Sequence, residues 1–137
     1  YLLIYKFLYM KNIFFLPVLA VMVSCSSTVK FPVSDVIPAA NFTVTKKTDK
    51  YDNIRVEVRG KNVASPERLN PPGNNYSIWI ETKEHGVLNI GQLKVDNGEK
   101  VELEATTPFD FSAIFITVEN EGNLHYPTGT EIARATV

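Results

Sequence analysis

Hydrophobic and polar residues alternate along most of the chain after residue 40, and a period of two residues is typical of β-strands. In the clearest run, residues 76–82, large apolar side chains occupy every second position. The other alternating runs are residues 41–47, 54–59, 87–95, 100–106, 113–119 and 130–137. We expect the strand at 76–82 to supply the hydrophobic face against which the others pack.

Turn signals separate these runs. The strongest is Asp96-Asn97-Gly98, because Asn-Gly favours the type I′ turn of tight hairpins. Gly91, inside a strand-like run, predicts a bulge or a close approach of another segment. The proline-rich residues 62–75 form the longest irregular stretch. The pattern predicts an all-β fold, an antiparallel, immunoglobulin-like β-sandwich of seven to eight strands. A small closed barrel is the alternative, because strand count does not separate the two.

The first part of the chain is far more apolar than the rest. Residues 13–23 form an apolar run that follows Met10 and Lys11. A positive charge before a short apolar core is typical of a signal peptide, and the run is shorter than the roughly 20 residues that span a membrane. We therefore expect Met10 to be the true start. The alternative is that residues 1–23 together form a membrane anchor.

The only cysteine, Cys25, ends the sequence Met22-Val23-Ser24-Cys25, just after the apolar run. This arrangement resembles the lipobox of bacterial lipoproteins, with methionine in place of the usual leucine. The resemblance implies that residues 1–24 are a lipoprotein signal peptide and that Cys25 becomes the lipid attachment site, carrying palmitate-type acyl chains. The protein would then be membrane-bound in the bacterial cell envelope, with its domain outside the cytoplasm. Acyl chains buried at about 0.8 kcal/mol per methylene anchor a protein stably.

Between the cysteine and the alternating runs, residues 25–40 are predicted to be a lipidated tether. This segment has prolines, few charges and no sustained period. Residues 41–137 would then form the sandwich domain. The alternative is that apolar residues such as Phe31 and Ile37 add an edge strand or pack on the domain.

The charge balance argues against a nucleic-acid partner. The net charge is -1 and acidic and basic residues are interspersed, whereas nucleic-acid binding needs a clustered basic face. One cysteine permits no intrachain disulfide and no cysteine-based zinc site. His85 and His125 lie in or beside predicted turns, and the Asp49 and Asp52 pair fits turn chemistry better than calcium binding. We expect no catalytic residue, no metal and no cofactor. A histidine that met a carboxylate and a nucleophile in a cleft would be the alternative.

An aromatic pair is the best candidate for a binding surface. By alternation, Trp79 points away from the core, and so does Phe115 in its own strand. If these strands are neighbours, the two rings form an exposed patch for a ligand or partner. The alternative, which the usual burial of large aromatic residues favours, is that Leu69, Pro71 and Pro72 fold over the pair.

Four short motifs occur in a fixed order in the second half of the chain. They are Tyr76-Ser77-Ile78-Trp79, Gly91-Gln92-Leu93, Ile116-Thr117-Val118-Glu119 and Pro127-Thr128-Gly129. This set resembles the extracytoplasmic C-terminal domain of anti-sigma-K factors over residues 60–137. The resemblance implies a β-sandwich outside the membrane that senses or binds another molecule.

The departures from that family limit what the resemblance implies. Its sigma-binding part is an N-terminal helical domain in the cytoplasm, to which residues 1–59 show no similarity. The usual Glu-Pro and paired-glycine pattern is replaced here by Glu119-Asn120-Glu121-Gly122. We therefore predict a lipid-anchored, non-catalytic interaction module with an envelope protein partner, without sigma-factor inhibition. The alternative is a lipoprotein that binds carbohydrate or another surface ligand.

Overall fold

The computed structural model describes residues 25–95 and 99–137. Within these residues the chain forms nine strands and one short 3₁₀ turn: β1 (Ser26–Lys30), β2 (Asn41–Thr48), β3 (Ile54–Lys61), η1 (Pro66–Arg68), β4 (Asn75–Thr82), β5 (Gly86–Gln92), β6 (Lys94–Val95), β7 (Val101–Thr107), β8 (Phe111–Glu119) and β9 (Glu131–Thr136). The predicted signal peptide and the Asp96-Asn97-Gly98 turn lie outside the described residues. Across the described ranges, no helix has the length and apolar character to cross a membrane.

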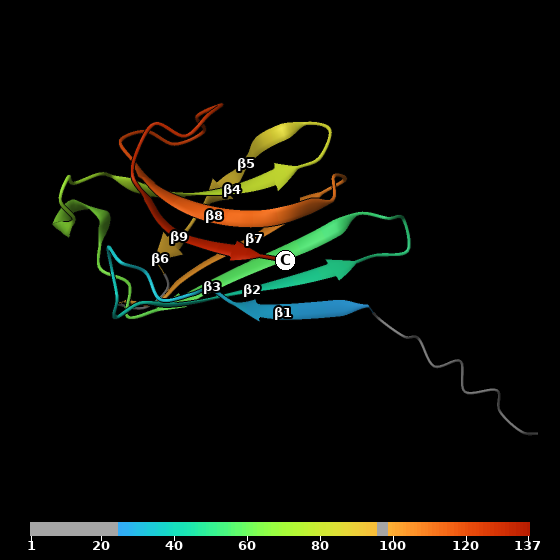
Figure 1. The fold of residues 1–137 in the computed structure, drawn as a ribbon, viewed down its shortest axis with the longest axis horizontal. Helices are drawn as coiled ribbons and strands as arrows, with labels where there is room; N and C mark the ends of the chain where they lie inside the picture. Colours follow the sequence, from blue (N-terminus) through green and yellow to red (C-terminus); the bar gives the residue numbers. More distant parts are fainter. Residues whose placement is uncertain (1–24, 96–98) are drawn as a thin grey trace, which may run out of the picture.

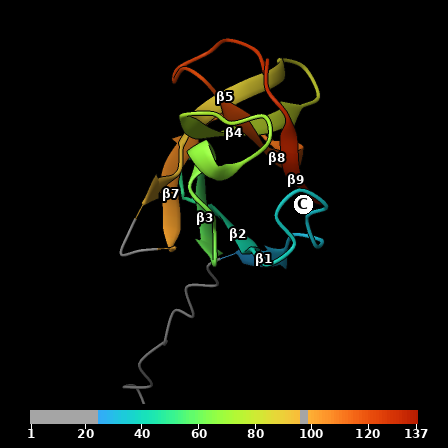
Figure 2. The ribbon, with the colours of Figure 1, turned by 90° about the vertical axis from the view of Figure 1, so that its left-hand side faces the viewer.

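The strands form two antiparallel sheets that pack face to face (Figure 1). One sheet has the order β1-β2-β3-β7-β6 and the other β5-β4-β8-β9. Figure 2, turned by 90°, shows the two layers one above the other. The predicted antiparallel β-sandwich is thus confirmed, while the immunoglobulin-like topology stays a prediction.

The core lies between the sheets and follows the predicted alternation. The fully covered side chains of β2 and β3 meet those of β4 and β8 in one hydrophobic cluster. Its most buried members, all at 1% exposure or less, are Val44, Val56, Val58, Ile78, Ile80, Ile114 and Ile116. Each such side chain contributes about 1.5–3 kcal/mol through its removal from water. The strand at 76–82 supplies a central apolar face, as predicted.

The predicted strand at 87–95 is two strands in different sheets. β5 pairs with β4, and β6 pairs with β7 in the opposite sheet. The β4–β5 register shifts beside Gly91, which has φ 138°. A Cβ atom at Gly91 would lie 3.0 Å from Cδ1 of Leu103. The bulge and the close approach predicted for this glycine are both present, and they let the chain pass from one sheet to the other.

The tether predicted at residues 25–40 is wrong, because this segment belongs to the sandwich. β1 pairs with β2 along its whole length, from Ser26 opposite Lys47 to Lys30 opposite Thr43. Phe31 then donates its backbone N–H to the Phe42 carbonyl at 3.0 Å, and the two rings pack edge to face.

The rest of this segment is also fixed. The buried Ser34 hydroxyl donates to the Ile132 carbonyl and accepts the N–H groups of Val36 and Ile37. Ile37 itself lies in the core at 8% exposure. Burial of its apolar side chains and pairing of its backbone outweigh the entropy that a free tether would keep. Within the described residues, the sandwich therefore begins at Ser26.

Candidate functional site

Trp79 and Phe115 lie side by side on the outer face of the four-stranded sheet. The β4–β8 register pairs them directly, and their rings stack with centroids 6.4 Å apart. Alternation therefore placed both side chains correctly. However, Trp79 is 0% and Phe115 is 5% exposed. The exposed aromatic patch predicted at these residues is wrong, because other parts of the chain cover the pair.

The segment between β8 and β9, residues 120–130, lies over this face, and we call it the 120–130 loop. It arches over β4, β5 and β8 in Figures 1 and 2. Asn89, the β5 partner of Trp79, donates to the Leu124 carbonyl of this loop at 3.0 Å. Leu69, expected to cover the pair, packs instead against the core cluster between the sheets.

Arg134 on β9 covers the neighbouring ring. Its guanidinium carbon lies 4.4 Å from the centroid of Phe115. The same guanidinium forms ion pairs with Glu81 at 2.5 Å and Glu131 at 2.6 Å. These side chains are roughly 40% exposed, so the ion pairs add little energy on their own but hold the cation over the ring.

A chain of hydrogen bonds runs from the buried indole to the 120–130 loop. Nε1 of Trp79 donates to Oγ1 of Thr117 at 2.8 Å, and this hydroxyl donates to Glu119 at 2.7 Å. The carboxylate of Glu119 also accepts the backbone N–H and the hydroxyl of Thr128, at 3.0 and 2.6 Å. Every polar side-chain atom in this hydrogen-bond network therefore has a partner, although Trp79, Thr117 and Glu119 are buried.

Glu119 is ionised in this setting despite being only 1% exposed. Burial alone raises the pKa of its carboxyl group, but the hydrogen bonds from Thr128, Thr117 and the Gly129 backbone outweigh burial, and the net pKa lies below its ordinary value. The negative charge thus fixes the 120–130 loop to the end of β8.

The residues that carry the family resemblance meet in this network. Trp79, Thr117, Glu119 and Thr128 belong to three of the four motifs and bond to one another. Gly129 completes it, since a Cβ atom there would lie 1.7 Å from the Val118 carbonyl oxygen. Residues of three of the four motifs thus attach the 120–130 loop to the sheet.

One end of the sandwich holds an open groove of about 570 Å³. It is lined by the β4–β5 turn, by residues 108–112, by Lys46 of β2 and by Val137. Nζ of Lys46 lies 2.5 Å from Asp110 and 4.4 Å from the ring centroid of Phe111. The hydrogen bond from Lys46 lowers the pKa of Asp110. Sequence reasoning missed this groove because its residues come from segments that meet only in the folded sandwich.

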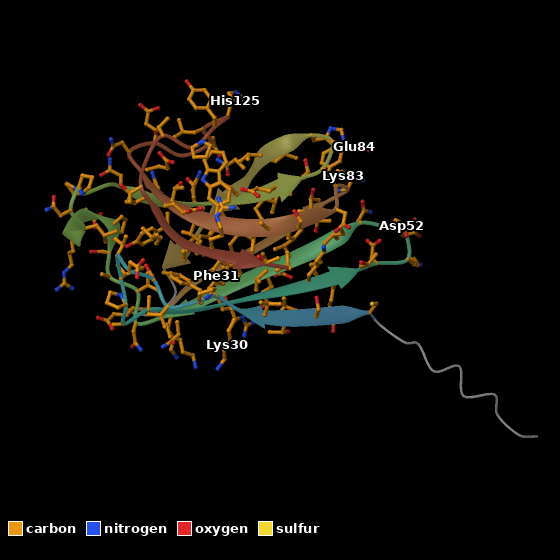
Figure 3. All side chains as sticks on the ribbon, in the orientation of Figure 1. Lys30, Phe31, Asp52, Lys83, Glu84 and His125 are labelled. Atoms are coloured by element: carbon orange, nitrogen blue, oxygen red, sulfur yellow. The ribbon has the colours of Figure 1, made fainter. Side chains whose placement is uncertain are left out.

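The two histidines occupy different surfaces. His85 lies in the groove with its ring centroid 4.1 Å from that of Phe109. His125 lies on the 120–130 loop, at the outer surface of the sandwich (Figure 3). In the part of the chain that the structure describes, no three His, Cys, Asp or Glu side chains come together as metal ligands.

Asp49 shows the turn chemistry expected for the acidic residues between β2 and β3. Its Oδ1 accepts the N–H groups of Tyr51 and Asn53 at 2.8 and 3.0 Å. These hydrogen bonds close the turn. The turn role predicted for this aspartate is thus confirmed.

Cys25 is exposed and its thiol is free. Its carbonyl accepts the Thr48 N–H at 3.4 Å, and β1 begins at the next residue. The cysteine therefore lies at the end of the sandwich where β2 ends and β3 begins, directly joined to an edge strand.

The segment from β1 to β2 carries two exposed apolar side chains. Val33 is 77% and Val36 is 40% exposed. The hydrogen bonds of Ser34, which lies between them, hold this stretch in one conformation. The chain thus presents a fixed apolar knob, Val33 with Val36, on its surface.

Comparisons of the chain with protein-family models, with curated proteins and with solved structures found no match.

Proposed function

We propose that this chain is a lipid-anchored protein of the bacterial cell envelope, and that its sandwich works by binding another envelope protein. The observation that carries the proposal is the position of Cys25. It is the only cysteine, it follows the apolar run at residues 13–23, and it is exposed where the folded domain begins. A thioether-linked lipid at this position would not disturb the core.

Metabolic labelling tests the anchor. Bacteria that express the full chain are grown with an alkyne-bearing palmitate analogue, and the protein is purified and coupled to a fluorophore. We expect label on the wild-type protein and none on Cys25→Ser. Mass spectrometry of the N-terminal peptide should show a diacylglyceryl group on Cys25. An unmodified cysteine in a membrane-inserted chain would support the alternative anchor formed by residues 1–23.

The apolar knob supports the binding role. Large apolar side chains held rigidly at a surface lose little entropy when a partner covers them. A photo-crosslinking residue at Val33 should therefore yield one discrete protein adduct in cells. The matched control is the same probe at Glu104, an exposed position on β7, away from the segment between β1 and β2. An equal set of adducts from both positions would count against a defined partner at the knob.

The carbohydrate-binding alternative has lost its main support. It depended on stacking of a sugar on Trp79 and Phe115, and both rings are buried. No other aromatic row with neighbouring polar groups was predicted. Protein binding is therefore the function we propose.

A further inference from the structure

The anchor and the sandwich are joined without a spacer. Ser26, the residue after Cys25, is already opposite Lys47 in the sheet. Each residue of an extended linker adds at most about 3.5 Å of reach, and here no linker residue exists. If Cys25 carries lipid, the end of the sandwich that holds it must lie at the bilayer surface.

Four chain segments meet at this end. They are the end of β2, which continues into the turn at residues 49–53, the turns at residues 83–85 and 108–110, and the end of β9 (Figure 1). Figure 3 shows Asp52, Lys83 and Glu84 at this end of the molecule. We call this surface the Cys25 end.

The Cys25 end is electrically balanced. Its lysines are Lys46, Lys47, Lys50 and Lys83, and its acids are Asp49, Asp52, Glu84 and Asp110. Arg55, opposite Lys47, is paired with Glu104. An anionic lipid surface attracts a protein by about 1 kcal/mol per nearby basic residue, and here the acids offset that attraction. Charge does not bring this end to a membrane, but neither does it repel one.

Tyr51 is the side chain at this end that best suits a headgroup layer. It is 72% exposed, and Nζ of Lys50 lies 5.1 Å from its ring centroid. Tyrosine favours membrane–water interfaces because one end of its ring is apolar and the other is polar. Tyr51 lies three residues from Thr48, so it is within about 10 Å of this residue, whose N–H bonds to the Cys25 carbonyl.

From these observations we propose that the Cys25 end sits directly on the phospholipid headgroups, with Tyr51 inserted among them. The inference rests on the lipid anchor proposed above. It places the groove beside Lys46 and Asp110 against the headgroup layer, and it leaves the flanks and the opposite end of the sandwich for a protein partner.

Site-specific fluorescence quenching tests this orientation. The full chain, purified from bacterial membranes with its lipid, carries a bimane label at Tyr51→Cys or at Glu67→Cys. Both residues are exposed, and Glu67 lies in η1 at the opposite end of the sandwich. β4, which runs between the two ends, has eight residues and spans roughly 25 Å. Vesicles of phosphatidylcholine and phosphatidylglycerol contain a lipid with a nitroxide on its headgroup.

We expect quenching to be several-fold stronger at position 51 than at position 67. A matched variant with six Gly and Ser residues inserted between Cys25 and Ser26 should lose most of this difference, because the insert reaches up to about 20 Å. Equal quenching at both positions of the acylated protein without the insert overturns the orientation alone. A protein without an acyl group on Cys25, found by mass spectrometry before reconstitution, overturns the anchor and the orientation together.

Discussion

At position 119 a carboxylate is held in a nearly dry setting, and the residues around it supply the donors that make this possible. A buried carboxylate without partners would lose its charge or destabilise the fold. Glu119 keeps its charge because Thr117 and Thr128 donate to both of its oxygens. The residue therefore works as a clamp between β8 and the 120–130 loop.

The first prediction concerns the charge of this clamp. Glu119→Gln replaces one acceptor oxygen with an amide donor that faces other donors, so we expect a loss of about 1–3 kcal/mol in the free energy of unfolding at pH 7. The folded-state pKa of Glu119 is lowered from 4.5, so its contribution is present above pH 4.5 and is lost as pH falls through the folded-state pKa.

Urea unfolding between pH 3 and pH 7, followed by Trp79 fluorescence, checks both statements. The free energy of unfolding of the wild type should fall more steeply below pH 4.5 than that of Glu119→Gln. Parallel pH curves for the two proteins would show that the carboxylate is not bonded in its ionised form.

The second prediction concerns the hydroxyl between the indole and the carboxylate. Thr117→Val leaves the N–H of Trp79 without its acceptor and removes one donor from Glu119, at a cost of about 1–3 kcal/mol in stability. Thr106→Val is the matched control, because Thr106 is exposed on a neighbouring sheet. The same denaturant midpoint for both variants would contradict the network.

At the residue scale, the sequence predicted which way side chains point better than it predicted how far they are buried. Alternation placed Trp79 and Phe115 on the same outer face, and their register shows them as direct neighbours. Their cover was not predictable, because the 120–130 loop attaches largely through backbone groups such as the Leu124 carbonyl and the Thr128 N–H. Backbone groups are present at every position and leave no signal in a sequence.

Among the elements, β1 and the segment that follows it extend the domain beyond its predicted start at residue 41. An apparently irregular stretch at the N-terminus completes one sheet and contributes Phe31 and Ile37 to the core. Its prolines, its few charges and its lack of a sustained period had suggested a tether. The strand itself is short, at five residues, and lies at the edge of its sheet. β1 carries no alternating pattern because only Val29 of its five residues packs against the core.

The third prediction tests whether residues 25–40 pack in the sandwich or form a free tether. Phe31→Ala should lower the free energy of unfolding by about 2–4 kcal/mol, because the ring is 8% exposed and packs on Phe42. Val33→Ala, two residues away and 77% exposed, should change it by less than about 0.5 kcal/mol. Urea unfolding of both variants gives the measurement. A tether would make the two substitutions equally harmless.

Most strands of the sandwich could be predicted from the sequence. The point at which the chain passes from one sheet to the other could not. Alternation predicted β3, β4 and β8 correctly, although only β3 is half-buried, whereas β4 and β8 are covered on both faces. The run at 87–95 looked like one strand because both of its parts are extended. Only Gly91 signalled the irregularity, and a single glycine does not say which sheet the chain joins next.

At the scale of the whole molecule, no spacer residue separates Cys25 from β1 in the described part of the chain. The edge strand β1 would therefore connect the sandwich directly to the proposed lipid anchor. A lipoprotein with a long tether can reach partners far from its membrane, but this sandwich would stay at the bilayer surface. Its fixed apolar knob at Val33 and Val36 would then be held at a set height, which restricts the partners that it can meet.

The fourth prediction uses proteolysis of the intact, acylated protein on vesicles. The first trypsin site after Cys25 is Lys30, the last residue of β1, where it pairs with Thr43. Proteases cut extended, unpaired backbone, so release of the domain requires β1 to separate from β2. We expect the domain to stay on the vesicles through a digestion that frees a variant with a Gly-Ser-Lys-Gly-Ser insert after Cys25. Release of both proteins at the same rate would mean that β1 is detached in the membrane-bound state, and the direct seating of the sandwich on the headgroups would fail with it.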